Sequence, residues 1–484
     1  MQVCWCEWTA QAFKRAEREQ KPVLLSLVTA WSEACAAMDR TTYTHPSVAQ
    51  LIEDEFVAVR VDGDYRPDLN ERYNLGGWPT TAFLTSAGDI LSGGTYLDAD
   101  EMTGVLRRVS AASRVRGAEL IARADELRRE SLETNRAAPV AEEDLSSLVT
   151  RFECLLLDRF DRRHGGFGSA PKFPHPRALV AALALEDERG SPELSTVVDR
   201  SLEQLAHLWD PADGGFCRYA WGEDWSQPCS ERTLDDNAAL LELYVEAAMN
   251  GRTECVDHAA AIVEWVQRSM SDGGGMGYHN ARGPAADPTR YVDRNAMMIA
   301  ALLRAAALFG DSQLRNAALA SFESVVVPTY VPGDGVAHVA SGPYGDVVRG
   351  LLSDQVHAAA ALIWAHAATG LLPYSMLAAE LMQYAIRQMW SDRDEAFRDR
   401  AAEHDPRVPF ELNCLAASVL HRLAALTGES AYHERARLIL RGLGSRCAAL
   451  DLHAAPYVSA VQEVIGRQPP AGLELSAIDW GLSS

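Results

Sequence analysis

A short pattern, in which Asp or Glu is followed two positions later by Asn or Val, opens amphipathic helices at intervals of about 58 residues along most of the chain. It begins at Asp235, Asp293, Asp354 and Glu411, with offsets of 58, 61 and 57 residues, and Pro176 and Pro456 open two similar helices. Partner helices are predicted between these starts, near residues 143–159, 195–209, 253–270, 311–326, 375–390 and 428–444. Because each helical hairpin buries its apolar face only against its neighbours, six inner and six outer helices predict a closed (α/α)6 toroid. An open helical solenoid is the alternative, but it does not explain the count of six.

The first hundred residues follow a different pattern, in which short apolar runs alternate with helices. A helix is predicted over residues 9–20, strands over 23–27, 56–62 and 80–84, and a returning hairpin strand over 90–92. Continuous apolar runs of this length indicate buried strands. A strand, a helix, a second strand and then a hairpin is the order of a thioredoxin-like domain.

These two patterns predict a multidomain protein with an α/β part and an all-α part. The expected boundaries are a thioredoxin-like domain over residues 1–99, a charged helical linker over 100–138, the toroid over 139–470 and a C-terminal tail over 471–484. The break at residues 135–139, where Asn, Arg, Ala, Ala and Pro follow one another, sets the start of the toroid.

Two motifs, Gly76-Gly77-Trp78-Pro79 and Gly93-Gly94-Thr95-Tyr96, are more specific than a CxxC motif alone. With Lys21-Pro22-Val23, they make residues 3–98 resemble the thioredoxin-like domain of the spermatogenesis-associated, YyaL-like family. Residues 165–174 and 225–238 resemble further segments of that family, and no clear match follows residue 240. The resemblance implies a thioredoxin-like domain fused to a six-hairpin-glycosidase-like toroid. It also implies that Pro79 is a cis proline facing the redox loop.

The redox loop departs from the family pattern. The family has Cys-His-Trp-Cys-His where this chain reads Ser32-Glu33-Ala34-Cys35-Ala36. Thiol exchange starts with an attacking thiolate, and the hydroxyl of Ser32 cannot form a mixed disulfide. We therefore expect Ser32, Cys35 and Pro79 to form a degenerate, redox-inactive motif. The alternative is that Cys35 acts as a lone reactive thiol.

Carboxylates gather at the starts of the predicted inner helices. The candidate catalytic residues are Glu231, Asp236, Asp293, Asp354 and Glu411, together with His357 as an acid or base. Toroids of this kind resemble those of six-hairpin glycosidases and sugar epimerases. If these helix starts face a central cavity, they present paired carboxylates for acid/base chemistry on sugars. The alternative is capping, in which the carboxylates accept hydrogen bonds from unpaired backbone N–H groups.

Three further residues are candidates for binding the substrate: Lys172, Trp225 and Asn237. Lys172 is one of only three lysines and suits contact with an anion or a sugar, whereas Trp225 could stack on a sugar ring. The alternatives are a solvated lysine and an aromatic side chain that packs within a loop.

Composition narrows the range of partners. The formal charge of −22 disfavours nucleic acid and anionic membranes, because the summed field repels phosphates. The scarcity of lysine suggests adaptation to high salt, and a GC-rich genome is the alternative. An odd number of cysteines, nine, argues against a disulfide framework. The chain lacks a secretory signal and a long apolar span, so a cytoplasmic location is expected.

Neither a metal nor a cofactor is predicted, because no P-loop, GxGxxG or HExxH motif is present. The expected partner is a small-molecule ligand in the toroid cavity, for which a sugar is the candidate. Three functions remain open from the sequence: a carbohydrate-active or sugar-isomerising enzyme, a binding or scaffold protein, and a thiol protein that acts through Cys35.

Overall fold

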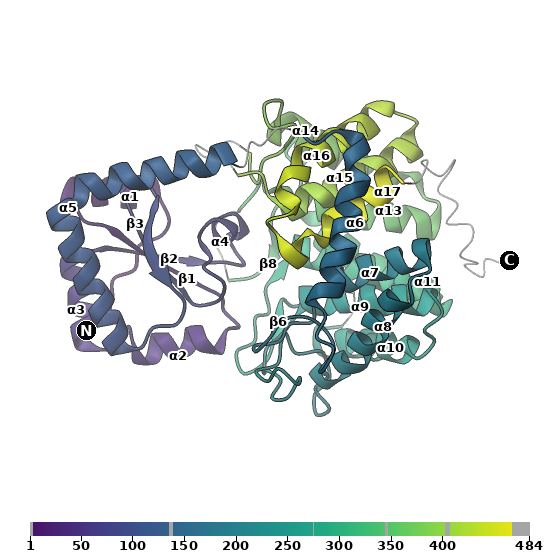
Figure 1. Ribbon diagram of the computed structural model, residues 1–484, viewed down its shortest axis with the longest axis horizontal. Helices are drawn as coiled ribbons and strands as arrows, with labels where there is room; N and C mark the ends of the chain where they lie inside the picture. Colours follow the sequence, from purple (N-terminus) through teal and green to yellow (C-terminus); the bar gives the residue numbers. More distant parts are fainter. Residues whose placement is uncertain (1–2, 135–138, 274, 344–346, 402–406, 467–484) are drawn as a thin grey trace. The chain divides into compact units, whose positions relative to one another are not determined.

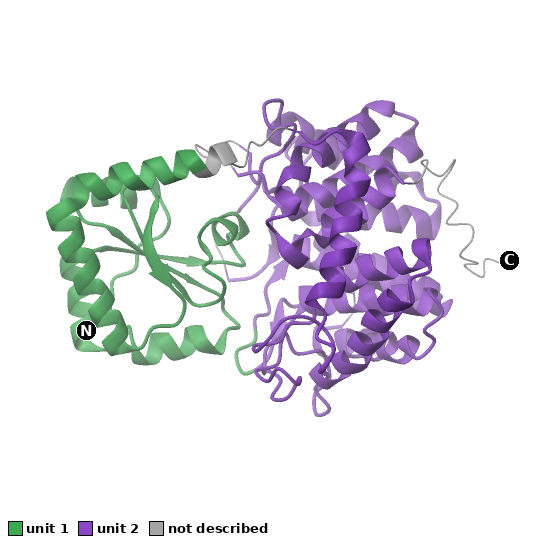
Figure 2. Cartoon of the chain, in the orientation of Figure 1, with its two compact units in different colours: residues 1–136, 284–286 green, residues 137–283, 287–484 purple. Residues whose placement is uncertain are grey.

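The computed structural model describes residues 3–134, 139–273, 275–343, 347–401 and 407–466. The chain forms two compact units (Figure 2). Unit 1 comprises residues 1–136 with 284–286, and unit 2 comprises residues 137–283 with 287–484. The tail expected over residues 471–484 lies outside the described residues. Among the described helices, none combines the length and the apolar character that crossing a membrane requires.

Unit 1 is built on a four-stranded sheet (Figure 1). The strand order is β2 (Val57–Asp62), β1 (Val23–Val28), β3 (Thr80–Leu84) and β4 (Ile90–Gly94). β2 runs parallel to β1, whereas β1 pairs antiparallel with β3 and β3 antiparallel with β4. Every residue of β1 and of β3 is buried, as their continuous apolar runs predicted.

Helices cover both faces of this sheet, and successive residues of β1 point to opposite faces. Leu25 packs with residues of α1 (Ala10–Glu19) and α4 (Pro67–Tyr73). Leu24, on the other face, packs with residues of α2, α3 and α5, which span Glu33–Thr41, Pro46–Glu55 and Ala99–Thr134. The thioredoxin-like fold is confirmed.

The long helix α5 belongs to unit 1, although the sequence predicted a linker there. Met102 and Leu106 in its first turns are fully buried in the core of unit 1. The helix kinks at Arg116, where φ is −130° and ψ is 27°. Beyond the kink, Nε of Arg128 lies 3.1 Å from Oδ1 of Asp89, which precedes β4. The expected start of the toroid, residue 139, follows four residues that the structure does not describe.

Unit 2 is built from helical hairpins, most of whose helices are labelled in Figure 1. The inner helices are α7 (Pro176–Arg189), α9 (Leu234–Met249), α11 (Val292–Phe309), α13 (Leu352–Thr369), α15 (Phe410–Thr427) and α17 (Ala455–Val464). The outer helices are α6 (Glu142–Arg159), α8 (Pro192–Leu205), α10 (Cys255–Ser269), α12 (Ser312–Val325), α14 (Leu372–Met389) and α16 (Ser430–Cys447). Each inner helix packs on the next, and α17 packs back on α7. The closure confirms the (α/α)6 toroid and rules out the open solenoid.

The inner helices are apolar on most of their circumference because they contact neighbours on several sides. Twelve of the 18 residues of α11 are buried, compared with seven of 18 in the outer helix α16. Connections from an inner to an outer helix are short, such as the two residues between α11 and α12. Connections in the other direction are long, such as residues 326–351, so the long loops gather at the N-terminal ends of the inner helices.

Candidate functional site

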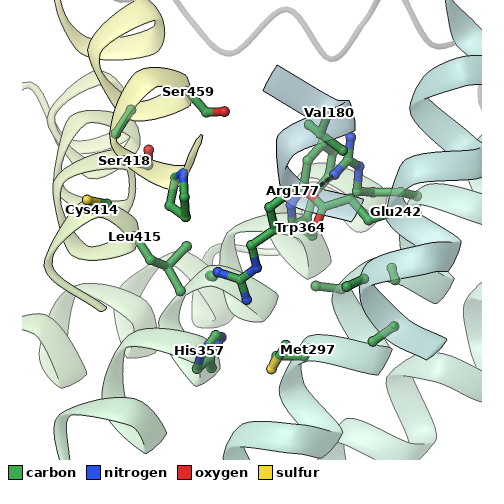
Figure 3. Close-up of a pocket in the computed structure, with 18 of the residues that line it drawn as sticks. Arg177, Val180, Glu242, Met297, His357, Trp364, Cys414, Leu415, Ser418 and Ser459 are labelled. Carbon is green, nitrogen blue, oxygen red and sulfur yellow. Dashed lines mark hydrogen bonds and ion pairs between the residues drawn. The ribbon is translucent and has the colours of Figure 1, made fainter. Parts of the chain in front are cut away.

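The inner helices enclose a cavity of about 390 Å³ in the middle of the toroid (Figure 3). Much of its wall is alanine, and nine charged or aromatic side chains project from it. These are Arg177, Glu242, Glu246, Arg304, His357, Trp364, Glu411, Arg422 and Glu463. Small-molecule sites commonly measure about 300–1,000 Å³, so the cavity is large enough to be one.

Arg177 extends into the middle of the cavity (Figure 3). α7 begins directly before it, because His175 adopts a left-handed conformation with φ of 46° and Pro176 occupies the first helical turn. Arg177 pairs with Glu411 of α15, and 37% and 51% of these side chains remain accessible. Burial lowers the pKa of Arg177, although Glu242 opposes this effect. The accessible fractions show that the pair faces the cavity and can contact a ligand.

Arg304 of α11 joins two carboxylates of the neighbouring helix α9. Its Nη1 lies 2.5 Å from Oε1 of Glu242, and its Nη2 pairs with Glu246. The residues are one helical turn apart on α9, so one guanidinium group holds both. Glu242 keeps 45% of its side chain accessible and can also accept a hydrogen bond from a ligand.

Trp364 of α13 lies close to two guanidinium groups in the same part of the cavity. The Cζ atoms of Arg304 and Arg422 are 5.0 and 5.7 Å from its ring centroids. Both distances permit cation–π attraction. Arg422 in turn donates from Nε to Oε1 of Glu463 at 2.6 Å. Each of the four cavity carboxylates therefore has an arginine partner.

His357 lies one turn into α13 and lines the cavity below Arg177 in Figure 3. Burial, together with the positive charges of Arg177 and Arg294, lowers its pKa to about 3. Its imidazole is therefore neutral at neutral pH and can accept a hydrogen bond, but the same burial and positive charges make it a weaker base than an exposed histidine. Of the six predicted catalytic residues, His357 and Glu411 are the two that line the cavity.

The repeated helix-start pattern is a structural clamp. The fourth residue of each of these helices is an Asn or Gln whose buried side-chain amide forms hydrogen bonds with both the backbone N–H and the backbone C=O of one residue in the preceding loop. Asn413, for example, accepts from Phe397 N at 2.7 Å and donates to Phe397 O at 2.9 Å and Pro409 O at 2.8 Å. The clamped pairs are Asn237 with Phe216, Asn295 with Tyr278, Gln355 with Val336, and Asn413 with Phe397. Asn237, predicted to bind substrate, therefore has a structural role.

The clamps also correct the register of the repeat. Glu411, Asp235 and Asp293 each lie two residues before the clamping amide of their helix. On α13, where the clamping amide is Gln355, the residue in that position is Ser353. The prediction that Asp354 shares this position was wrong by one residue. The alternative, that the carboxylates at the starts of the inner helices cap the backbone N–H groups, is not supported as a shared role. Among the described contacts, only Asp293 accepts a backbone N–H, that of Arg294 at 2.8 Å.

Glu231 and Asp236, which were expected to be catalytic, share Arg218 and do not line the cavity. Nε of Arg218 donates to Oδ2 of Asp236 at 2.8 Å, and its Nη1 lies 3.6 Å from Oε2 of Glu231. Thr233, the N-cap of α9, also donates to Oδ2 of Asp236 at 2.7 Å. These contacts hold the start of α9 to the preceding loop.

Asp293 and Asp354 meet in a buried cluster with His338, a loop residue that the sequence did not single out. Nδ1 of His338 is 2.8 Å from Oδ1 of Asp354 and 4.0 Å from Oδ1 of Asp293. Burial raises the pKa of Asp293 to about 6; Asp354 adds to the rise and His338 opposes it. Neither aspartate lines the cavity.

Lys172 and Trp225 are buried, which contradicts their predicted contact with substrate. Lys172 has no exposed surface, pairs with Asp161 and lies 5.4 Å from the ring of Trp225. Trp225 is 1% exposed, and its Nε1 donates to His164 O at 3.0 Å. The alternative prediction, that Lys172 is a solvated surface residue, was also wrong.

In unit 1, Ser32 and Cys35 lie at the start of α2. Ser32 is the N-cap, and its Oγ accepts from Cys35 N at 3.4 Å. Cys35 is 3% exposed, and burial raises the pKa of its thiol. The Trp78–Pro79 peptide bond is cis, as the family resemblance implied.

Sequence reasoning missed most of the polar cavity wall: Arg177, Glu242, Glu246, Arg304, Trp364, Arg422 and Glu463. Arg304 is flanked by Leu302, Leu303 and three alanines, and Glu242 by apolar residues of α9. A charged residue inside a helix that is otherwise apolar all round must face another polar group or a cavity. That signal could have located them.

Residues 1–133 match the family model described as Thioredox_DsbH, a protein of unknown function (DUF255). An uncharacterized Caenorhabditis elegans protein is 28% identical over 391 residues, covering 73% of this chain and 52% of that protein. Human spermatogenesis-associated protein 20 is 27% identical over 316 residues, covering 60% and 40%. This chain is similar in sequence to spermatogenesis-associated protein 20. The chain spans about half or less of the length of these two relatives.

Solved structures resemble the toroid. A sugar epimerase from a ruminal bacterium matches with a TM-score of 0.55 at 12% identity, over 63% of this chain and 86% of that one. A D-mannose isomerase gives 0.53 at 12% identity over the same shares. The GH76 α-mannanase of Bacteroides thetaiotaomicron gives 0.52 at 11% identity, over 66% and 95%. At these identities the likeness establishes the six-hairpin-glycosidase-like fold.

Proposed function

We propose that the toroid binds a sugar in its central cavity and acts on it as a sugar-isomerising enzyme, with His357 transferring the proton. The observation that carries this proposal is the accessible Arg177–Glu411 pair beside the neutral imidazole of His357.

The charge balance of the cavity suits a neutral, polyhydroxylated ligand. Three arginines and four glutamates line it, so neither sign dominates. Carboxylates accept hydrogen bonds and guanidinium groups donate them, whereas a sugar hydroxyl can do both. A strongly anionic ligand would face the four glutamates, and a strongly cationic ligand the three arginines.

Isomerisation fits the cavity better than glycoside hydrolysis. Hydrolysis requires one carboxylic acid that donates a proton and a second carboxylate. All four cavity carboxylates are paired with arginines, so none is distinguished as a proton donor. Isomerisation instead requires a base for the proton on the carbon beside the open-chain carbonyl. We assign that base to His357, whose imidazole lines the cavity and is neutral but only weakly basic in the free protein, and Arg177 can stabilise the negative charge that develops on the carbonyl oxygen.

The related folds support a carbohydrate ligand by analogy. A sugar epimerase, a D-mannose isomerase and an α-mannanase share the toroid, although function depends on the site and not on the fold.

Exchange of the C2 proton of monosaccharides in D₂O, followed by NMR, tests the proposal. D-Mannose, D-glucose and cellobiose are suitable probes. We expect exchange with the wild-type chain and a loss of about 10²-fold or more with His357→Gln, the usual size of a general acid/base contribution. Asp236→Asn is the matched control, because Asp236 lies outside the cavity, and it should keep most of the activity. Absence of both binding and exchange across the panel would refute the proposal.

A non-catalytic binding protein is the second candidate. It is favoured by Ser32, which stands where the family has the attacking cysteine. The third function, a thiol protein acting through Cys35, is disfavoured because that thiol is buried and its pKa is raised.

A further inference from the structure

Asp293, His338 and Asp354 come from three separate segments of the toroid and meet in one buried cluster. Asp293 and Asp354 lie in the first turns of α11 and α13, and His338 directly precedes β8 (Val339–Ser341). Their exposed fractions are 5%, 1% and 0%. The ring of Tyr291 lies 4.9 Å from that of His338, which restricts the orientation of the imidazole.

The spacing of the donor atoms suits a single cation. One ligand atom from each residue lies within 4.8 Å of the other two. Ligands that bind one ion at about 2.0–2.2 Å lie roughly 3 to 4.3 Å apart. The His338–Asp354 distance of 2.8 Å and the His338–Asp293 distance of 4.0 Å bracket most of that range. Small rotations of the side chains would therefore complete a coordination shell.

The charges of the cluster are not balanced by the protein alone. Among the described residues, His338 is the only basic side chain that pairs with either carboxylate. Two buried carboxylates and one imidazole carry a net negative charge even when the imidazole is protonated, and burying such a charge costs several kcal/mol. In addition, Oδ2 of Asp354 is buried and has no hydrogen-bond partner among the described residues.

Two arrangements could neutralise the cluster. In the first, a proton on Asp293 and an imidazolium at His338 balance Asp354, but Oδ2 of Asp354 still lacks a partner. In the second, a divalent cation balances both carboxylates, His338 is neutral, and Oδ2 of Asp354 can bind the ion. The second arrangement accounts for the unpaired oxygen.

We propose that Asp293, His338 and Asp354 bind a divalent transition-metal ion that fastens the loop before β8 to α11 and α13. A donor set of one imidazole nitrogen and two carboxylates suits Zn²⁺ or Mn²⁺, whereas Mg²⁺ and Ca²⁺ prefer oxygen alone. Because the three ligands are almost completely buried, the ion has a structural role at the loop-bearing end of the toroid. This site does not depend on the proposed sugar chemistry.

Titration of the chelator-treated full-length protein with MnCl₂, followed by electron paramagnetic resonance, tests this proposal. Mn²⁺ favours oxygen and nitrogen over thiolate ligands, so the nine cysteines should not compete. We expect one bound Mn²⁺ per chain and a higher melting temperature in its presence. Asp354→Asn should weaken binding at least about tenfold, the smallest effect usual for groups that support a metal. His279→Gln should bind normally, because the imidazole of His279 pairs with Asp272, at 3.1 Å, and does not belong to the cluster.

Metal-free Asp354→Asn should fold at least as stably as wild type, because it removes one of two buried like charges. If it does not fold, Asp293→Asn provides the same comparison. Wild-type protein that binds neither Mn²⁺ nor Zn²⁺ would overturn the proposal in favour of the shared proton. Equal Mn²⁺ stoichiometry in wild type and in both aspartate variants would also overturn it.

Discussion

The ammonium group of Lys172 pairs with the carboxylate of Asp161 although Lys172 has no exposed surface. Asp161 opens a glycine-rich loop, and its Oδ1 accepts from Arg163 N at 2.9 Å. The next hairpin repeats this arrangement: Asp210 accepts from Ala212 N at 2.9 Å and pairs with Arg232. Each loop is therefore held by one aspartate that binds the loop backbone and a cation from a later segment.

Lys172→Met should destabilise unit 2. Burial by itself would raise the pKa of Asp161, but Lys172 and two backbone N–H groups lower it to about 2. Removing one partner of a buried pair commonly costs about 3–5 kcal/mol; the effect should be smaller here because 21% of the Asp161 side chain is exposed. Urea unfolding measures the change, with Lys14→Met at an exposed position as the control. Equal stability of the two variants would contradict the structural role.

Asn413→Ala should destabilise the toroid more than the same substitution at a surface asparagine. It leaves the backbone groups of Phe397 and Pro409 without the three hydrogen bonds of the clamp. Buried groups left unpaired cost about 1–3 kcal/mol each, so we expect a loss of about 2–4 kcal/mol after relaxation. Asn316→Ala, on the exposed surface of α12, is the matched control in thermal or urea unfolding. A loss below that of the control would show that the clamp is dispensable.

Unit 1 should have no thiol–disulfide exchange activity, because Ser32 replaces the attacking thiol. The wild-type chain should reduce insulin at the background rate. Ser32→Cys should form a disulfide with Cys35 on oxidation, detectable by mass spectrometry and absent when Cys35 is also changed to Ser. Wild-type reductase activity that disappears in Cys35→Ser would instead make Cys35 a reactive thiol.

The stability of metal-free protein should carry a pH-dependent contribution from Asp293. Its pKa of about 6 in the folded state exceeds the ordinary value of about 3.9. Between about pH 4 and pH 6 the folded chain therefore binds more protons than the unfolded chain. The stabilisation is complete below about pH 4 and is lost as pH rises through about 6. Subtracting the unfolding free energy of Asp293→Asn at each pH isolates this slope. Asp158→Asn changes an exposed carboxylate and is the control; identical profiles for both variants would contradict the raised pKa.

If the acidic, lysine-poor composition reflects adaptation to salt, the melting temperature should rise as KCl increases from about 0.1 to 2 M. Screening of repulsion among the charges contributes mainly at low ionic strength, since the Debye length is only about 3 Å at 1 M. A further rise above that concentration would indicate specific adaptation. A flat profile would leave a GC-rich genome as the explanation for the composition.

The periodicity of the sequence by itself determined both folds. Apolar runs such as Val23–Leu27 and the recurring helix starts near 58-residue intervals carry local information, because burial of a strand or a helix face depends on spacing along the chain. The count of six helical hairpins favoured a closed ring over an open solenoid, and the packing of α17 on α7 confirmed the closure.

Only the tertiary structure decided which residues share a site. A shift of one residue turns a helical side chain by about 100°, so Asp354 points to His338 while its sequence pattern matched that of Glu411 at the cavity. His338 reaches Asp293 through a long loop, whose path no local pattern specifies. Arg177 and Glu411 are far apart along the chain and meet because the ring closes. Burial of charge forces such residues to find partners, but the packing of distant helices determines which partners they find.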